Sequence, residues 1–190
     1  MAGLLQDASG NLYGTTFAGG TNGYGTVFKV TPAGVETVLY SFSGGTDGQY
    51  PQAGLIQDAS GNLYGTTYGI DLYGGTNSNG TVFKVTPSGV GTVLYSFGTG
   101  TDGNYPYAGL IQDASGNLYG TTTGGGANNK GTVFKVTPAG VETVLHSFGT
   151  GTDGRYPYAG LIQDTSGNLY GTTHGGGTNN IGTVFKISPR

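Results

Sequence analysis

Tyrosine and asparagine side chains recur in two sets of loops, where they could bind a neutral polyol such as a glycan. A Tyr ring offers an apolar face with a polar tip, and an Asn amide offers adaptable hydrogen bonds. Several copies of such a site would raise avidity. The candidate ligand-binding residues are Tyr50, Tyr105, Tyr107, Tyr156, Tyr158, Asn77, Asn128, Asn129, Asn179 and Asn180. The alternative for each Tyr is a ring wedged between neighbouring repeats beside a proline.

Aspartates occupy two further repeated positions. Asp7, Asp58, Asp113 and Asp164 each stand four residues before an Asn, in the pattern Asp-x-Ser-Gly-Asn. There an Asp side chain is expected to cap backbone N–H groups of a turn. The Thr-Asp-Gly triplets also indicate turns, and one carboxylate per loop falls short of the usual Ca²⁺ ligand set. We therefore predict neither a metal site nor a cofactor.

The two histidines form no recognisable catalytic pattern. His146 replaces a strand tyrosine and is interpreted as a packing substitution, whereas His174 lies in a variable loop. No Ser-His-Asp chain, pair of His ligands or isolated carboxylate pair can be argued. The glycine runs 124–126 and 175–177 lack the Lys-Ser/Thr of a phosphate loop and are interpreted as flexible turns. We predict that the chain is not an enzyme.

Composition narrows the class of protein. The chain has 190 residues with 41 Gly, and its 14 Tyr and 8 Phe can form a core, so glycine is expected to mark turns. The net charge of −3 shows no basic stripe, which argues against nucleic-acid binding. There are no cysteines and no apolar run long enough to span a bilayer, and the N-terminal residues predict no signal peptide.

The loops that carry these candidates are spaced by a fourfold repeat. The stretch Gly54–Thr67 is a β-hairpin signature, with Gly61 suited to a positive φ in its turn. Copies start at residues 3, 54, 109 and 160, which gives spacings of 51, 55 and 51 residues. A period of this size dictates the architecture.

Each period contains four β-type segments, strands A to D. In the second repeat they are expected at Leu55–Asp58, Asn62–Thr67, Thr81–Thr86 and Thr92–Phe97. No window has a 3.6-residue apolar period, so no helix is expected. The pattern predicts an all-β fold, a β-propeller of four-stranded blades of about 51 residues. The alternatives are a β-solenoid or a string of separate hairpins.

The repeats predict a single domain over 1–190. Its blades are expected at 3–53, 54–108, 109–159 and 160–190, the last lacking its outer strand D. The position of Met1 just before a repeat suggests a fragment of a longer array. The open last blade favours a homo-oligomer, because an unpaired edge invites pairing; four blades closing on themselves is the alternative.

Variation among the repeats is concentrated in two connections. The B–C loops are residues 17–24, 68–79, 123–130 and 174–181, and the second is four residues longer than the others. The D–A connections are residues 48–52, 103–107 and 154–158. In up-and-down blades both sets emerge on the same face, and variable loops on rigid strands are typical of a binding surface. Neutral drift is the alternative.

The strings Gly61–Thr67, Gly80–Pro87 and Leu94–Phe97 resemble the bacterial tandem repeat called GloVer and, more loosely, NHL-type propeller repeats. The resemblance covers nearly the whole chain. It implies an extracellular or cell-surface propeller, although this chain shows neither an export signal nor an anchor.

We therefore predict a non-catalytic extracellular β-propeller module, a binding or adhesion surface for glycans or cell-surface polymers. The alternative function is a structural protein, natural, shortened or designed, that assembles into a ring or surface polymer. A lactonase-like or lyase-like propeller enzyme is set aside in favour of these two.

Overall fold

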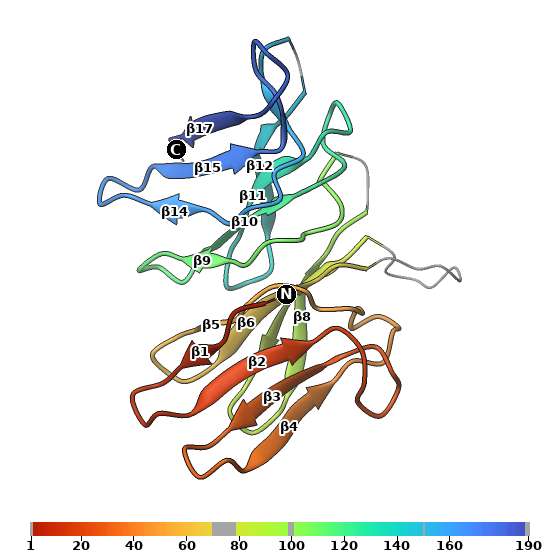
Figure 1. Ribbon diagram of the computed structural model, residues 1–190, viewed down its shortest axis with the longest axis vertical. Coiled ribbons are helices and arrows are strands. Elements are labelled where there is room, and N and C mark those ends of the chain that lie inside the picture. Colours follow the sequence, from red (N-terminus) through yellow and green to blue (C-terminus); the bar gives the residue numbers. More distant parts are fainter. Residues whose placement is uncertain (1, 70–78, 99–100, 150, 189–190) are drawn as a thin grey trace. The chain divides into compact units, whose positions relative to one another are not determined.

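The computed structural model describes residues 2–69, 79–98, 101–149 and 151–188 (Figure 1). All regular structure in these ranges is β-strand, arranged in antiparallel sheets, as predicted. In the described part of the chain, no helix is long and apolar enough to cross a membrane. The chain divides into two compact units, residues 1–96 and 97–190. The prediction of a single domain over 1–190 stays a prediction.

Unit 1 (residues 1–96) contains two four-stranded sheets, one from each of the first two repeats. The first sheet consists of β1 (Leu5–Gln6), β2 (Leu12–Thr16), β3 (Thr26–Val30) and β4 (Glu36–Ser41). The second consists of β5 (Ile56–Gln57), β6 (Leu63–Thr67), β7 (Thr81–Val85) and β8 (Gly91–Ser96). Both sheets have their strands in chain order, as in an up-and-down blade.

Unit 2 (residues 97–190) repeats this plan. Its first sheet consists of β9 (Ile111–Gln112), β10 (Leu118–Thr122), β11 (Thr132–Val136) and β12 (Glu142–Ser147). The last sheet has three described strands: β14 (Ile162–Gln163), β15 (Leu169–Thr173) and β17 (Thr183–Ile187). A separate short pair joins β13 (Gly154–Arg155) to β16 (Gly175–Gly176).

The turn between strands A and B has the predicted geometry. Gly167 has a φ of +83°, and Gly61 has a φ of +80°. Asp164 accepts hydrogen bonds from the Asn168 side chain at 2.8 Å and from the Tyr170 hydroxyl at 2.9 Å. The hydrogen bond from Asn168 is the main reason that the pKa of Asp164 is lowered to about 2. Backbone hydrogen bonds and the bond from Tyr170 lower this pKa further, and together they outweigh partial desolvation. Each of the four predicted aspartates caps its turn with the same set of donors.

A bulge explains why strand D places apolar residues on both of its faces. Val82 is opposite Tyr95, but the next residue, Phe83, is opposite Val93, so Leu94 is the extra residue. The same register shift occurs in the first and third repeats. Val82 and Phe83 are both buried, as expected for a sheet covered on both faces.

Aromatic contacts between consecutive repeats form the core of each unit. In unit 1 the ring of Phe42 meets Phe83 edge-on with centroids 5.1 Å apart, and in unit 2 Phe148 meets Phe185 in the same way at 5.0 Å. Gly65 of β6 permits this packing, because a Cβ there would lie 2.7 Å from the Phe83 ring and 3.0 Å from Leu55. The core therefore packs the sheets of consecutive repeats directly against each other.

Candidate functional site

Within each unit, backbone hydrogen bonds join one D–A connection to the B–C loops of the repeats on either side. In unit 1 the amide of Tyr50 donates to the carbonyl of Tyr24 at 2.9 Å, and its carbonyl accepts from the amide of Tyr68 at 3.1 Å. In unit 2 Tyr156 bonds in the same way to Lys130 at 2.8 Å and to His174 at 3.1 Å. Within each unit the two loop sets therefore lie together, as predicted, on a side that we call the loop face.

The tyrosine of the D–A connection has an unusual backbone conformation. Tyr50, Tyr105 and Tyr156 have φ values of 58°, 57° and 58°. This left-handed region costs a residue with a Cβ about 1–2 kcal/mol, and Tyr is not among the types that visit it routinely. In Tyr50 and Tyr156 the amide and the carbonyl bond to two different repeats, and in Tyr105 the carbonyl bonds to the amide of Thr123. These links between repeats are made by the backbone, and the alternative of a Tyr ring wedged between repeats stays a prediction.

The loop face of unit 1 carries a neutral cluster, which we define as Phe17, Tyr24, Tyr50, Pro51 and Gln52. The rings of Phe17 and Tyr50 stack with centroids 4.6 Å apart and planes 15° apart, and Tyr24 is tilted against Tyr50 at 5.9 Å. A hollow of about 390 Å³ adjoins the stack. Its lining consists of Ala2, Thr15, Phe17, Pro51 and Gln52. None of these side chains carries a charge.

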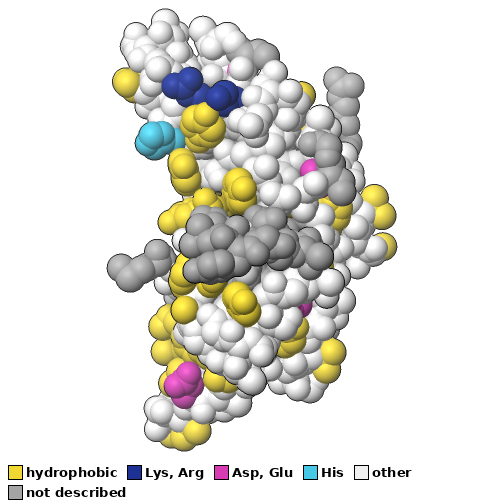
Figure 2. Space-filling view, turned by 90° about the vertical axis from the view of Figure 1, so that its right-hand side faces the viewer, with side chains coloured by type: hydrophobic (Ala, Val, Ile, Leu, Met, Phe, Trp, Pro, Cys, Tyr) yellow, Lys and Arg dark blue, Asp and Glu magenta, His cyan; other side chains and the backbone are white. Residues whose placement is uncertain are grey.

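The loop face of unit 2 carries a cationic cluster, which we define as Lys130, Arg155, Tyr156, Tyr158 and His174. Lys130 Nζ donates to the Tyr156 hydroxyl at 2.8 Å, and the Arg155 guanidinium lies 5.8 Å from the Tyr156 ring centroid. His174 meets Tyr158 edge-on at 5.7 Å. Figure 2 shows basic side chains gathered beside hydrophobic ones and a His on this part of the surface.

The cationic cluster alters the chemistry of its central phenol. The hydrogen bond from Lys130 lowers the pKa of the Tyr156 hydroxyl. Desolvation opposes this effect, and the charges of Lys130 and Arg155 add to the lowering. Among the described residues, neither Lys130 nor Arg155 has a carboxylate within ion-pair distance.

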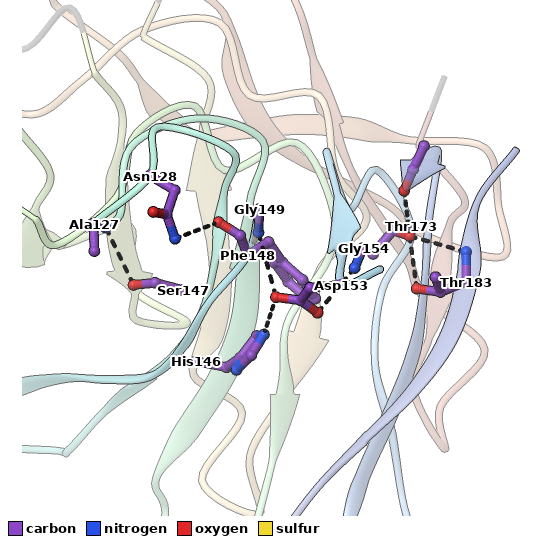
Figure 3. Close-up of polar contacts among 11 residues, drawn as sticks. Ala127, Asn128, His146, Ser147, Phe148, Gly149, Asp153, Gly154, Thr173 and Thr183 are labelled. Carbon is purple, nitrogen blue, oxygen red and sulfur yellow. Dashed lines mark hydrogen bonds and ion pairs between the residues drawn. The ribbon is translucent and has the colours of Figure 1, made fainter. Parts of the chain in front are cut away.

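A network around Asp153 positions the connection that carries Arg155 and Tyr156. Figure 3 shows Asp153 between the ring of His146, at 2.9 Å, and the amides of Gly149 and Gly154, at 3.3 and 2.8 Å. In unit 1 the hydroxyl of Tyr40 replaces the imidazole and donates to Asp47 at 2.9 Å. His146 also packs edge-on against Phe148 at 4.7 Å, so the predicted packing role is confirmed.

The glycine run at 175–177 is ordered, which corrects its interpretation as a flexible turn. Gly154 pairs with Gly176, and Arg155 pairs with Gly175, in the β13–β16 ladder. A Cβ on Gly175 would lie 2.8 Å from Arg155 Nε, so the absence of a side chain gives the Arg155 side chain its space. Isolated strand pairs of this kind have no periodic sequence signal.

The remaining predicted tyrosines also lie in unit 2. Tyr107 meets Tyr158 edge-on at 5.6 Å, and the Tyr105 carbonyl accepts from the amide of Thr123 at 3.1 Å. Tyr158 is 47% exposed. The structure therefore brings Tyr107, Tyr156 and Tyr158 into one region, and it places Tyr50 in the other unit.

Most of the predicted asparagines shape their loops. Asn128 donates to the carbonyl of Phe148 at 3.2 Å, and the Asn129 side chain accepts from the amide of Gly125 at 3.0 Å. Asn129 and Asn180 have positive φ values of 53° and 59°, which Asn tolerates well. Asn179 is exposed. Asn77 lies outside the described residues.

Sequence reasoning did not select Phe17, Lys130 or Arg155. A signal for the two cations was present, because the other lysines of the chain lie in strand C. Three of those lysines cover strand B tyrosines at 5.7–5.9 Å from the ring centroid. Lys130 and Arg155 stand outside that pattern, in the variable connections.

Unit 2 contains one further group of unusual chemistry, the carboxyl of Glu142. Burial first, and then the charge of Asp102, raises the pKa of Glu142 to about 7. Its Oε1 makes no hydrogen bond to any described residue. The equivalent positions in unit 1 are Glu36, which is exposed, and Gly91, which lies beside a hollow of about 370 Å³ that Tyr40 and Asp47 also line.

The repeat and the fold are matched by known proteins. Residues 2–190 match the Gloeobacter/Verrucomicrobia repeat. No curated protein matches the chain. Among solved structures, the chain is similar to a gluconolactonase from Xanthomonas campestris, at 16% identity and a TM-score of 0.59, covering 98% of this chain and 62% of that one.

Two other solved structures illustrate the range of the fold. Virginiamycin B lyase from Staphylococcus aureus matches at 13% identity and a TM-score of 0.57, covering 98% of this chain and 55% of that one. The extracellular domain of a two-component system from B. thetaiotaomicron matches at 14% identity and a TM-score of 0.63, covering 100% of this chain and 20% of that one. The chain thus spans less than two thirds of each of these proteins. The predicted propeller class is confirmed.

These neighbours correct the prediction that the chain is not an enzyme. That prediction was wrong, because the same fold is found in proteins named as a gluconolactonase and as a lyase. It relied on finding no familiar triad or metal motif in the sequence. Such motifs do not transfer between unrelated folds, so their absence excludes little.

Proposed function

Because the chain belongs to the Gloeobacter/Verrucomicrobia repeat family, we propose that it is an extracellular binding or adhesion module whose loop face takes carbohydrate. The observation that carries the proposal is the hollow of about 390 Å³ beside the stacked rings of Phe17 and Tyr50. Its volume is within the range of small-molecule sites, which are mostly apolar with a few placed polar groups. The lining of Thr15, Phe17, Pro51 and Gln52 fits that description.

A neutral sugar suits this lining better than an ion does. The C–H face of a sugar ring can pack on the exposed Phe17 ring. The Gln52 amide supplies a neutral donor and acceptor, and the Thr15 hydroxyl, which donates to the Ala53 carbonyl at 3.1 Å, supplies an acceptor. The extracellular location is supported by the extracellular domain among the structural neighbours.

The test is a glycan array with the purified chain, followed by titration calorimetry of the best neutral ligand. Phe17→Ala is expected to weaken binding of that ligand about tenfold, because the ring supplies most of the apolar contact. Val35→Ala is the matched control, since Val35 is 59% exposed and lies outside the loop face. Silence across neutral and acidic glycans would overturn the proposal.

A second candidate function, structural self-association, is supported by the outer edge of the last sheet. Val184 of β17 is 80% exposed, whereas Val82 and Val133 at the equivalent positions are fully buried. Exposed strand edges favour pairing between copies. Light scattering over a range of concentrations should show species larger than 19.2 kDa, and Val184→Lys should reduce them. A monomer at every concentration would contradict this candidate.

A further inference from the structure

The cations of the cationic cluster are not needed to build the loop face. Tyr24 of unit 1 and Lys130 of unit 2 occupy equivalent positions and accept the same backbone hydrogen bond, at 2.9 and 2.8 Å. Gln49 likewise corresponds to Arg155. Because the connection forms in unit 1 without any cation, the charges in unit 2 have no evident structural purpose.

The two charges converge on one ring and, among the described residues, have no acidic partner. Lys130 Nζ is 5.2 Å and the Arg155 guanidinium 5.8 Å from the centroid of Tyr156. The chain as a whole carries a net charge of −3, yet no carboxylate among the described residues forms an ion pair with either cation. Such a site attracts an anion, and a guanidinium can bind a carboxylate with two parallel hydrogen bonds.

Aromatic surface adjoins the charges. His174 is exposed, its amide donates to the Tyr156 carbonyl, and its ring meets the half-exposed Tyr158. The neighbouring residue Gly175 pairs with Arg155 and leaves room for its side chain. A ligand held by its anionic group at Arg155 and Lys130 would therefore find ring faces beside it.

We propose that the cationic cluster binds an acidic saccharide, with a uronic-acid carboxylate at Arg155 and Lys130 and the sugar ring against Tyr158 and His174. This inference rests on the proposed carbohydrate-binding function and assigns a ligand class to unit 2. A neutral sugar would leave the two cations unused. An acidic peptide would use the cations but has no rigid C–H face for Tyr158.

The experiment is titration calorimetry with tetragalacturonate as the probe. Lys130→Gln and Arg155→Gln are each expected to raise the Kd about tenfold, which corresponds to one charge-assisted hydrogen bond. Arg155→Lys keeps the charge but loses the planar fork, so a smaller increase of about threefold is expected. Lys29→Gln, which makes the same charge change over Tyr13 in unit 1, should leave the Kd unchanged.

Two comparison ligands decide between outcomes. A neutral tetrasaccharide, cellotetraose, should bind independently of Lys130 and Arg155, and polyaspartate of equal charge should bind at least tenfold more weakly than the uronate. No uronate binding, an unchanged Kd in both Gln variants, or equal binding of polyaspartate would overturn the inference. Phe17-dependent neutral binding without uronate binding would overturn this inference while leaving the proposed function standing. Thermal melting confirms that each variant is folded.

Discussion

The neutral cluster of unit 1 and the cationic cluster of unit 2 share one backbone and differ in chemistry. In both, a tyrosine with a positive φ links the carbonyl of the preceding loop to the amide of the following one. In unit 1 the flanking side chains are Tyr24 and Gln49, and in unit 2 they are Lys130 and Arg155. Backbone hydrogen bonds and glycines therefore determine the conformation of the loop face, and its side chains can differ between units without changing that conformation.

The largest effect is expected from adding a Cβ to a glycine of the backbone that both loop faces share. Gly131 has a φ of +98°, and a Cβ there would meet the Thr122 carbonyl and lie 2.7 Å from Pro157 Cδ. We expect Gly131→Ala to destabilise unit 2 by about 3 kcal/mol, and Gly25→Ala to do the same in unit 1. Urea denaturation with hydrogen exchange of each unit measures both losses.

Gly34→Ala is the control for these substitutions. Its φ is +79°, but nothing lies within 4 Å of the added Cβ, so a cost of about 1 kcal/mol is expected. If Gly131→Ala costs no more than Gly34→Ala, the frame does not depend on close contact at this glycine.

Acid should weaken both units in the same way, because both contain the Asp-capped turn. The pKa of Asp164 is lowered to about 2, against about 3.9 in an unfolded chain. A lowered pKa in the folded state means that the stabilisation is present above pH 4 and is lost as the pH falls toward 2. The free energy of unfolding, measured between pH 2 and 5, should fall over that window. Asp164→Asn should flatten this dependence in β14–β15 but leave it in β1–β2, where Asp7 is intact.

Exchanging one side chain between the clusters sharpens the comparison. Lys130→Tyr gives unit 2 the residue that unit 1 has at this position, and it should weaken uronate binding about tenfold with little change in stability. The reverse change, Tyr24→Lys, should give unit 1 a weak affinity for uronate. Calorimetry with tetragalacturonate measures both, and an unaltered affinity in the two variants would show that the cations do not select the ligand.

The smallest expected effect concerns Glu142, which has no carboxyl counterpart at Gly91. Its pKa is raised to about 7, so its stabilising effect is present below about pH 4.5 and is lost as the pH rises through 7. Glu142→Gln should therefore raise the free energy of unfolding by on the order of 1 kcal/mol at pH 8, a value reduced because the group is half-exposed and partly screened by solvent. At pH 4 the substitution should change nothing. Hydrogen exchange in β11–β12 measures the gain. The exposed Glu36→Gln is the matched control and should change nothing at either pH.

Much of the β-strand framework was predictable because short stretches of sequence determine its strands and turns. Strands B, C and D of the second repeat were expected at 62–67, 81–86 and 92–97, and they lie at 63–67, 81–85 and 91–96. The hairpin turn was also found, because an Asp, a Gly and an Asn at fixed offsets determine it. Such signals depend on neighbours in the sequence alone.

The chemistry of the loop face was not predictable in the same way. A Tyr before a Pro is expected to be extended, and Tyr50 adopts a positive φ because tertiary hydrogen bonds override that preference. Lys130 and Arg155 are separated in the sequence by two strands, β11 and β12, and they meet only because the connection bonds back to the preceding loop. The composition suggested neutral sugar binding throughout, whereas the contacts distinguish two kinds of surface.

The tyrosine with a positive φ, Tyr50 or Tyr156, anchors B–C loops of different length in the same way. The B–C loop of the second repeat has four extra residues, yet the Tyr50 carbonyl still accepts a hydrogen bond from the amide of Tyr68. The Tyr156 carbonyl accepts the same bond from His174, in a repeat with a shorter loop. The anchoring bond is made by the first residue of the loop, before any added length begins. New segments could thus be spliced in behind that anchor, which makes this chain a host for transplanted recognition sequences.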